Sequence, residues 1–262
     1  MNILLDPDAR PVVAHRGGCA RGPENTLEAM QLGVAEGADA IEFDVHLCAD
    51  GKVVVIHDAT VDRTTDGSGA VDQMSLANLR SLDAACRFTG VQPSPPISRP
   101  CRIPTLGEVL ESFPRIPLII EVKTRAASVQ TRALIEQHGA EDRCLVDSVH
   151  ADALAVFRGS RIARGPSRNG VARLIIKSFL HGASRNLEPS ALCIPRSYRG
   201  FPLPIKRLSA LMRSAGKTVH VWTVNDRREA IELWGLGVSG IITDDVPAIR
   251  SARAEMSGKK LG

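Results

Sequence analysis

The sequence predicts an α/β protein that folds as a (β/α)8 barrel, the TIM-barrel architecture, with a small insertion after the second strand. Short runs of apolar and β-branched residues alternate with helix-like segments along almost the whole chain. Such alternation is typical of parallel strands joined by helical crossovers. The chain has 262 residues, close to the roughly 250 residues of a typical barrel of this kind. An open, doubly wound sheet is the competing architecture.

Strand-like and helix-like segments follow one another in a regular order. The strand-like segments are residues 11–14, 40–45, 118–122, 144–148, 161–164, 192–195, 218–222 and 240–242. The helix-like segments include residues 26–36, 106–112, 128–138, 151–157, 204–215 and 227–234. Thr26 and Ser128 are expected N-caps, because a hydroxyl oxygen at that position accepts a hydrogen bond from the first helical turn. This order predicts parallel pairing between consecutive strands.

Two segments fall outside this repeat. Residues 52–56 follow Asp50-Gly51, which is a turn signal, so they are expected to form an extra strand that doubles back beside the second strand. Residues 83–102 are rich in Pro, Ser and Arg and are expected to form a long surface insertion. We expect one barrel domain over residues 1–255 and a flexible tail over residues 256–262.

Composition and charge disfavour several classes of protein. The net charge is +4, aromatic residues make up 3%, and no dense block of Lys or Arg occurs, so no nucleic-acid partner is expected. No stretch approaches the ~20 apolar residues of a membrane span, so stable membrane insertion is not expected. The N-terminus lacks the parts of a secretory signal, and the six cysteines include no CxxC pair. These features favour a cytoplasmic protein with reduced thiols, either a monomer or a homodimer.

Charged residues stand at the ends of the first two predicted barrel strands. His15 and Arg16 follow the first strand directly. Glu42 and Asp44 lie two residues apart in the second strand, so both side chains project from the same face. Because the C-terminal ends of barrel strands meet at one mouth, we expect these side chains to lie close together.

The third predicted strand and the extra strand add further candidates. Glu121 and Lys123 are also two residues apart, and His57 ends the extra strand. Several carboxylates at one mouth would repel one another, and a bound cation resolves that conflict. Oxygen ligands favour Mg²⁺ or Ca²⁺ over zinc. The sequence therefore predicts a site for one divalent cation between two histidines.

Each of these patterns also has a purely structural interpretation. A single histidine at a strand end is usually structural, a Glu-x-Asp pattern is often a solvated face, and a Glu-x-Lys pattern can be a simple salt bridge. The functional interpretation is favoured because all these groups converge on strand ends. Glu42 and Glu121 also lie in otherwise apolar runs, where a solvated face is hard to arrange.

Several longer motifs follow one another in a fixed order. They are Ala-His-Arg-Gly-Gly-Cys-Ala-Arg-Gly-Pro-Glu-Asn-Thr at 14–26, Ile-Glu-Phe-Asp-Val-His-Leu at 41–47, Val-Ile-His-Asp at 55–58, Glu-Val-Lys at 121–123, Val-Trp-Thr-Val-Asn at 221–225 and Gly-Ile-Ile-Thr-Asp at 240–244. Through these motifs the chain resembles the glycerophosphodiester phosphodiesterase family, in its bacterial cytosolic type, over nearly its whole length. Residues 158–185 match the pattern poorly.

The resemblance implies a (β/α)8 barrel and metal-dependent hydrolysis of glycerophosphodiesters to sn-glycerol 3-phosphate and an alcohol. It implies that His15 and His57 are the catalytic acid–base pair. The implied cation ligands are Glu42, Asp44 and Glu121, and the implied phosphate-binding groups are Arg16 and Lys123. Trp222, at the end of a predicted strand, could wall the substrate pocket or could pack in the core.

Two questions stay open at this point. The nucleophile is either water or a hydroxyl of the glycerol, and His57 is favoured as the base with His15 as the acid. The substrate is either a small glycerophosphodiester or a lipid, as in lysophospholipase D-like or sphingomyelinase D-like release of a head group. A lipid would need an apolar channel, for which residues 195–203 are the candidate. A barrel that only binds phosphate esters is the non-enzymatic alternative.

Overall fold

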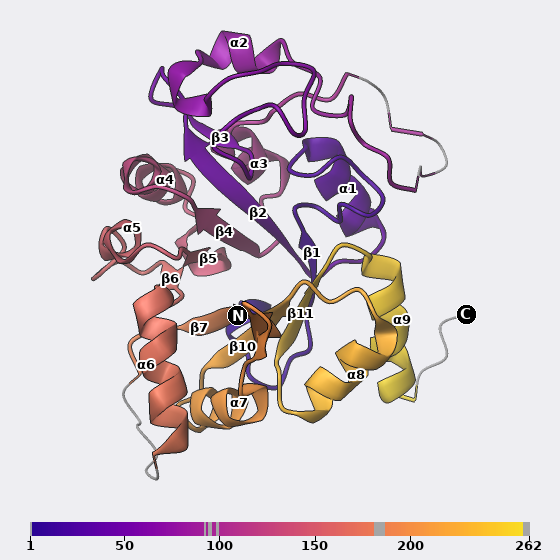
Figure 1. Cartoon of the computed structure of the whole chain (residues 1–262), viewed down its shortest axis with the longest axis vertical. Coiled ribbons are helices and arrows are strands. Elements are labelled where there is room, and N and C mark those ends of the chain that lie inside the picture. The colour runs from indigo at the N-terminus through magenta and orange to yellow at the C-terminus, as the bar shows by residue number, and fades with distance from the viewer. Residues whose placement is uncertain (1, 92, 94–95, 98–99, 181–186, 259–262) are drawn as a thin grey trace.

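The computed structural model describes residues 2–91, 93, 96–97, 100–180 and 187–258. Within them, parallel strands form one path in the order β6–β5–β4–β2–β1–β11–β10–β7. These strands are β1 (Val12–His15), β2 (Ala40–Leu47), β4 (Leu118–Val122), β5 (Cys144–Asp147), β6 (Ala163–Arg164), β7 (Ala191–Pro195), β10 (Thr218–Trp222) and β11 (Gly240–Thr243). Neighbours in this path are consecutive parallel strands of the chain, except that the first, β1, pairs with the last, β11 (Figure 1), which confirms the predicted (β/α)8 barrel.

The barrel is nearly closed, because polar contacts span the space between the two end strands of the path. Ser190 N–H, just before β7, donates to the carbonyl of Arg164 in β6 at 2.8 Å. Arg164 N–H donates in turn to Ser190 Oγ at 3.4 Å. The strand predicted at 161–164 is therefore present, but it is shortened to Ala163–Arg164.

Apolar side chains fill the barrel and close the end at which its strands begin. The interior cluster consists of Leu4, Val13, Ala40, Ile119, Leu145, Ala163, Ala191 and Ile242. Leu4 comes from the 3-10 helix η1 (Ile3–Leu5) and is fully buried. Its carbonyl accepts hydrogen bonds of 2.8 Å from Thr218 Oγ1 and from His220 Nε2. Since Thr218 begins β10, the N-terminal segment plugs the end of the barrel opposite the strand C-termini.

Helices cover the outside of the barrel with their apolar faces. They are α1 (Leu27–Ala35), α3 (Leu106–Ser112), α4 (Arg125–Gln137), α5 (Ala151–Ala155), α6 (Arg168–Phe179), α7 (Ile205–Ser214), α8 (Arg227–Gly235) and α9 (Val246–Met256), and the 3-10 helix η3 (Glu141–Arg143) precedes β5. Thr26 is the N-cap of α1, as predicted. Ser128 is not a cap, because the extended residue before α4 is Thr124, whose Oγ1 accepts from Ala127 N–H at 3.3 Å.

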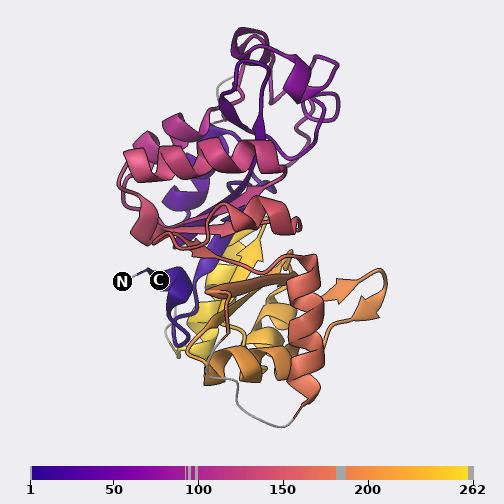
Figure 2. The ribbon, with the colours of Figure 1, turned by 90° about the vertical axis from the view of Figure 1, so that its left-hand side faces the viewer.

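The predicted extra strand is present as β3 (Val53–Val55), which pairs antiparallel with β2. The chain beyond it forms an insertion with the short helices η2 (Val71–Gln73) and α2 (Leu76–Arg80). The insertion has its own apolar cluster of Cys48, Val54, Ile56, Val61, Val71, Leu79, Ala84 and Ile103. Figures 1 and 2 show it at one end of the molecule, beyond β2. Of the predicted surface insertion, residues 92, 94, 95, 98 and 99 lie outside the described residues.

A second excursion follows β7 on the other side of the barrel. β8 (Ser197–Tyr198) and β9 (Phe201–Pro202) form a short antiparallel hairpin. Figure 2 shows this hairpin projecting past α6, a helix that the sequence had not indicated. At the C-terminus, α9 includes Met256, the first residue of the expected tail, and residues 259–262 of that tail lie outside the described residues.

Candidate active site

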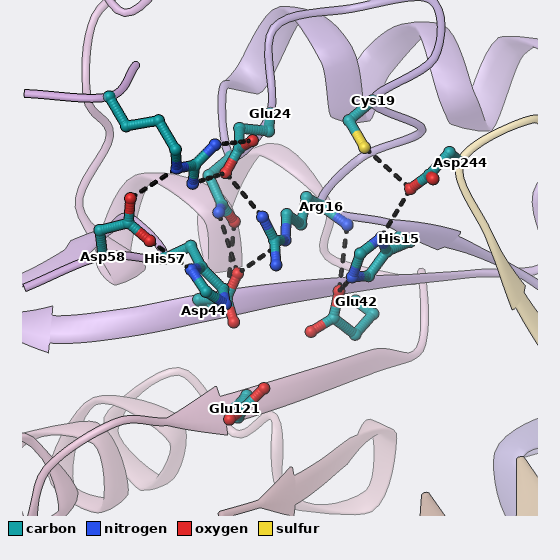
Figure 3. A network of polar contacts seen from close by, with 12 residues as sticks. His15, Arg16, Cys19, Glu24, Glu42, Asp44, His57, Asp58, Glu121 and Asp244 are labelled. Atoms are coloured by element: carbon teal, nitrogen blue, oxygen red, sulfur yellow. Dashed lines mark hydrogen bonds and ion pairs between the residues drawn. The ribbon is translucent and has the colours of Figure 1, made fainter. Parts of the chain in front are cut away.

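The ends of β1, β2 and β4 bring the predicted charged residues together. The parallel register places His15 opposite Glu42, and Asp44 opposite Glu121. Figure 3 shows His15 and His57 on the two sides of the carboxylates of Glu42, Asp44 and Glu121. The predicted residues therefore meet at the C-terminal mouth of the barrel.

The three carboxylates form a cluster that suits a cation. Glu42, Asp44 and Glu121 each offer an oxygen within 4.8 Å of the other two. Glu42 is 6% exposed and Asp44 is 1% exposed. Burial raises the pKa of Glu42 to about 7, and the neighbouring Asp44 carboxylate adds to the shift. A divalent cation would relieve this repulsion, and carboxylate oxygens are the ligands that Mg²⁺ and Ca²⁺ prefer.

Asp44 is kept ionised by the positively charged groups around it. Burial acts to raise the pKa of Asp44, but the charges of Lys123 and Arg16 outweigh burial and lower it. Lys123 Nζ lies 2.7 Å from Asp44 Oδ1 and 2.9 Å from Glu121 Oε1. Arg16 Nε lies 3.4 Å from Asp44 Oδ2. The two residues predicted to bind phosphate therefore lie at the carboxylate cluster itself.

A tight loop after β1 positions Arg16. Arg16 has a φ of 50° and Gly17 a φ of 92°. A Cβ on Gly17 would lie 2.8 Å from the backbone nitrogen of Met30 in α1, so this close approach requires glycine. The turn directs the Arg16 backbone N–H to Glu42 Oε2 at 3.0 Å, and Arg16 Nη1 to Glu24 Oε1 at 2.9 Å.

His15 is oriented by Asp244, which lies just after β11. His15 Nδ1 is 2.6 Å from Asp244 Oδ1, while its Nε2 lies 3.9 Å from Glu42 Oε2. Burial acts to lower the pKa of His15, but the hydrogen bond to Asp244 and the charge of Glu42 raise it overall. Asp244 also accepts hydrogen bonds of 2.8 Å from Cys19 Sγ and Asn225 Nδ2.

The pKa of Asp244 reflects this set of donors. Burial acts to raise it, but the hydrogen bonds from His15, Cys19 and Asn225 outweigh burial and lower it to about 2. Asp244 is therefore ionised at neutral pH. A carboxylate on Nδ1 stabilises the imidazolium of His15 and leaves Nε2 facing the cluster.

His57 has a matching partner on the opposite side of the cluster. His57 Nδ1 is 2.6 Å from Asp58 Oδ1. Asp58 Oδ2 accepts from Arg63 Nε at 2.5 Å, and Arg63 also contacts Glu24 at 2.7 and 2.8 Å. The hydrogen bond from Arg63 lowers the pKa of Asp58 to about 2, although burial opposes the shift. Both histidines thus have a carboxylate at Nδ1.

Trp222 and Asp147 border the cluster on the side of α6. Trp222 ends β10, is 40% exposed, and lines a pocket together with Glu121 and Asp147. It therefore lies at the mouth and not in the barrel core. Asp147 ends β5 opposite Glu121, and burial raises its pKa to about 8.

Within the described residues, no helix combines the length and apolar character needed to cross a membrane.

Sequence reasoning assigned no role to four charged residues of this site. Asp58 and Asp244 stand inside the recognised motifs, so a signal was present, but the motifs do not tell which side chain touches which histidine. Arg63 lies in the insertion and begins an Arg-Thr-Thr run at 63–65 that also follows the family pattern, but this run does not tell which residues Arg63 contacts. Asp147 has only its position at a strand end as a signal.

Comparison with known proteins identifies the family of this chain. The sequence profile of the glycerophosphoryl diester phosphodiesterase family matches residues 15–248. The chain belongs to this family. It is therefore a phosphoric diester hydrolase, as the sequence predicted. A glycerophosphodiester phosphodiesterase of Bacillus subtilis (strain 168) is 30% identical over 257 residues, which cover 92% of this chain and 85% of that protein.

Solved structures of similar proteins agree with the fold. The glycerophosphoryl diester phosphodiesterase domain of a Mycobacterium tuberculosis protein aligns with a TM-score of 0.82 at 23% identity, covering 94% of this chain and 100% of that one. A phosphodiesterase from Oleispira antarctica, solved in complex with the product sn-glycerol-3-phosphate, aligns with a TM-score of 0.73 at 28% identity, covering 94% and 97% of the two chains.

Proposed function

We propose that this chain hydrolyses glycerophosphodiesters to sn-glycerol 3-phosphate and an alcohol, with His15 and His57 transferring protons on either side of one divalent cation. One observation carries this proposal. Two imidazoles, each held through Nδ1 by a carboxylate at 2.6 Å, flank a buried cluster of carboxylates. The relative from Oleispira antarctica, which binds sn-glycerol-3-phosphate as its product, supports the choice of substrate.

Glu42, Asp44 and Glu121 would hold the cation, and their oxygen donors favour Mg²⁺ or Ca²⁺. Such a cation, when bound, neutralises phosphate oxygens and lowers the pKa of a bound hydroxyl or water. Arg16 and Lys123 lie at the same cluster, and in this proposal they contact phosphate oxygens and stabilise charge that develops on them. Trp222 walls the substrate on the side of α6.

The two histidines divide the proton transfers. His57 removes the proton of the attacking hydroxyl, and His15 protonates the oxygen that leaves phosphorus. The raised pKa of His15 supports this division, because an acid must carry its proton at the start of the reaction. Asp244 and Asp58 hold the two rings in place and stabilise the positive charge that each ring carries when protonated.

The first experiment tests the reaction and the cation together. Metal-stripped protein is incubated with glycerophosphocholine, Mg²⁺ or Ca²⁺ is added back separately, and glycerol 3-phosphate is measured. Release of glycerol 3-phosphate that depends on an added cation supports the proposal. No release with either cation would refute it.

The second experiment tests the histidine pair. His15→Ala and His57→Ala are each expected to lower kcat at least ~100-fold, the lower end of the usual contribution of proton transfer. His150→Ala is the matched control, because this exposed histidine precedes α5 and its side chain caps no helix. Thermal unfolding checks that all three variants fold. Full activity in both site variants would show that other groups transfer the protons.

A further inference from the structure

A second group of possible metal ligands lies next to the carboxylate cluster, on the other side of His15. His15, Cys19 and Asp244 each offer one ligand atom, and these atoms lie within 4.8 Å of one another. His15 Nδ1 is 2.6 Å and Cys19 Sγ is 2.8 Å from the same oxygen, Asp244 Oδ1. Figure 3 shows Cys19 and His15 reaching Asp244 from two sides, with Glu42 on the far side of the His15 ring. We call these three residues the thiol cluster.

The backbone holds the members of the thiol cluster together. His15 ends β1, and Asp244 directly follows β11, which pairs with β1. The loop that carries Cys19 turns back on β1, because Cys19 N–H donates to the carbonyl of His15 at 3.3 Å. Ala20 N–H donates to the carbonyl of Asp244 at 3.2 Å, which ties the same loop to the end of β11. The three ligand atoms therefore come from two neighbouring strand ends and from a loop that is bonded to both.

Solvent reaches the thiol cluster. The side chains of His15 and Asp244 are 16% and 23% exposed, and Cys19 is half-buried. Cys19 also lines a pocket of about 290 Å³, together with Glu24 and with Arg63 of the insertion. An ion in solution therefore has a path to the sulfur atom.

The donor atoms of the thiol cluster favour a different metal from those of the carboxylate cluster. Carboxylates alone suit Mg²⁺ or Ca²⁺, whereas a thiolate, an imidazole and a carboxylate together suit Zn²⁺. Hydrogen bonding gives little reason for a cysteine at position 19, because a thiol is a weak donor and a serine hydroxyl would donate better to Asp244. Burial and the Asp244 carboxylate raise the pKa of the Cys19 thiol. A bound cation removes this conflict, because it deprotonates a thiol that coordinates it.

We infer that His15 Nδ1, Cys19 Sγ and a carboxylate oxygen of Asp244 bind Zn²⁺, and that this ion inhibits the enzyme. Zinc takes the place of the protons on Nδ1 and Sγ, which pass to solvent, and water fills the fourth position of the tetrahedral site. Ligand atoms of such a site lie roughly 3.3–3.6 Å apart, so the three atoms need to separate by less than about 1 Å. Side-chain rotation supplies a movement of this size.

Inhibition follows from the position of the ion on the His15 ring. With zinc on Nδ1, the ring carries one proton, on Nε2, and no longer forms the imidazolium that serves as the acid. Asp244 is also drawn to the ion and no longer accepts a hydrogen bond from Nδ1. This effect on catalysis rests on the proposed function, whereas the binding of zinc does not.

Co²⁺ tests the metal site without a measurement of activity, because cobalt bonded to a thiolate gives an intense charge-transfer absorption in the near ultraviolet. In excess Mg²⁺, addition of Co²⁺ to the parent protein should produce this absorption. Cys19→Ser should lose it. Cys86→Ser should keep it and is the matched control, since Cys86 is exposed and lies outside the thiol cluster. No absorption in the parent protein, or the same absorption in Cys19→Ser, would overturn the inference.

The second measurement is inhibition by Zn²⁺ of glycerophosphocholine hydrolysis in excess Mg²⁺ or Ca²⁺, with each rate expressed relative to the zinc-free rate of the same protein. The parent protein and Cys86→Ser should be half-inhibited at the same zinc concentration. Cys19→Ser should need at least about tenfold more zinc, because loss of even an outer partner of a ligand weakens metal binding about 10–100-fold. Equal inhibition of all three proteins would place zinc at the carboxylate cluster and overturn the inference, as would an uninhibited parent protein. No hydrolysis before zinc is added would instead overturn the proposed function, and the cobalt absorption would still test the metal site.

Discussion

The contact between His15 and Asp244 allows a quantitative test of the active site. In Asp244→Asn, the carboxylate is replaced by an amide with one acceptor oxygen. Asp244 accepts from three donors, namely His15 Nδ1, Cys19 Sγ and Asn225 Nδ2. One amide oxygen cannot replace two carboxylate oxygens. Its NH₂ group would donate to Nδ1 of His15 and favour the neutral tautomer with the proton on Nε2.

The size of the effect follows from the pKa of Asp244. The folded protein lowers this pKa from 3.8 to about 2, and a difference of this size corresponds to about 2.4 kcal/mol. Three donors share that energy, and the side chain of Asp244 is 23% exposed, so solvent screens part of it. About 1 kcal/mol is therefore assigned to the hydrogen bond between His15 and Asp244. Losing this energy in Asp244→Asn corresponds to a fall of about 0.7 in the pKa of His15.

The assay is the pH dependence of kcat/KM. Because His15 is the acid in the proposed mechanism, activity should fall as pH rises and His15 loses its proton, and Asp244→Asn should move this limb of the pH profile about 0.7 pH unit to lower pH. Loss of ring orientation adds to this, so the maximal rate should fall about 100-fold. Asp245→Asn is the control, since Asp245 caps α9 and Asn is an equally good cap. An unchanged limb and an unchanged rate in Asp244→Asn would refute the proposed role of the pair.

Three further predictions concern the cluster and the barrel. In metal-stripped protein, the raised pKa of Glu42, from 4.5 to about 7, should lower the free energy of unfolding by up to about 3 kcal/mol as pH rises from 4.5 to 7. Asp147, whose pKa is raised to about 8, adds a fall of its own in every variant that keeps it. In urea unfolding, Glu42→Gln should therefore show a total fall about 3 kcal/mol smaller than that of the parent protein, and falls of equal size would contradict the assignment. Lys123→Met removes the buried partner of Asp44 and should cost about 3 kcal/mol in urea unfolding, so a neutral result would show that the pair contributes nothing. Leu4→Ala removes the side chain that plugs the barrel and should lower the free energy of unfolding by about 2–5 kcal/mol. Calorimetry should show that the affinity for the cation is unchanged. Loss of that affinity would mean that the two ends of the barrel are coupled.

The course of the barrel was predictable because strands and helices differ in the spacing of their buried residues. Ile41, Phe43 and Val45 alternate with Glu42 and Asp44 in β2, and this alternation already indicates which side chains reach the mouth. The extra strand β3 was predictable from its turn. The start of α4 was not predictable from the sequence, because Thr124 and Ser128 are both good N-cap residues in isolation. The backbone at the end of β4 decides between them.

The poorly matching middle of the chain contributed least to the sequence prediction. Helix α6 and the β8–β9 hairpin lie in or just after this region, and both contribute to the pocket beside Trp222. Residues 195–203 were the candidate for an apolar channel, but the apolar residues of α6 gave no such signal in the sequence. Whether they face a core, a solvent surface or a cavity depends on how α6 sits beside β7, which no local pattern determines.

The sequence by itself indicated the fold class, the family and the cluster of Glu42, Asp44 and Glu121, because strand periodicity and motif order are local properties of the chain. Only the tertiary structure decided the contacts between distant residues. His15 and Asp244 are 229 residues apart, and Arg63 and Glu24 are 39 residues apart. These pairs meet only when β11 closes against β1 and the insertion folds back over the mouth. A side-chain contact depends on that closure and register, which local patterns of hydrophobicity do not encode.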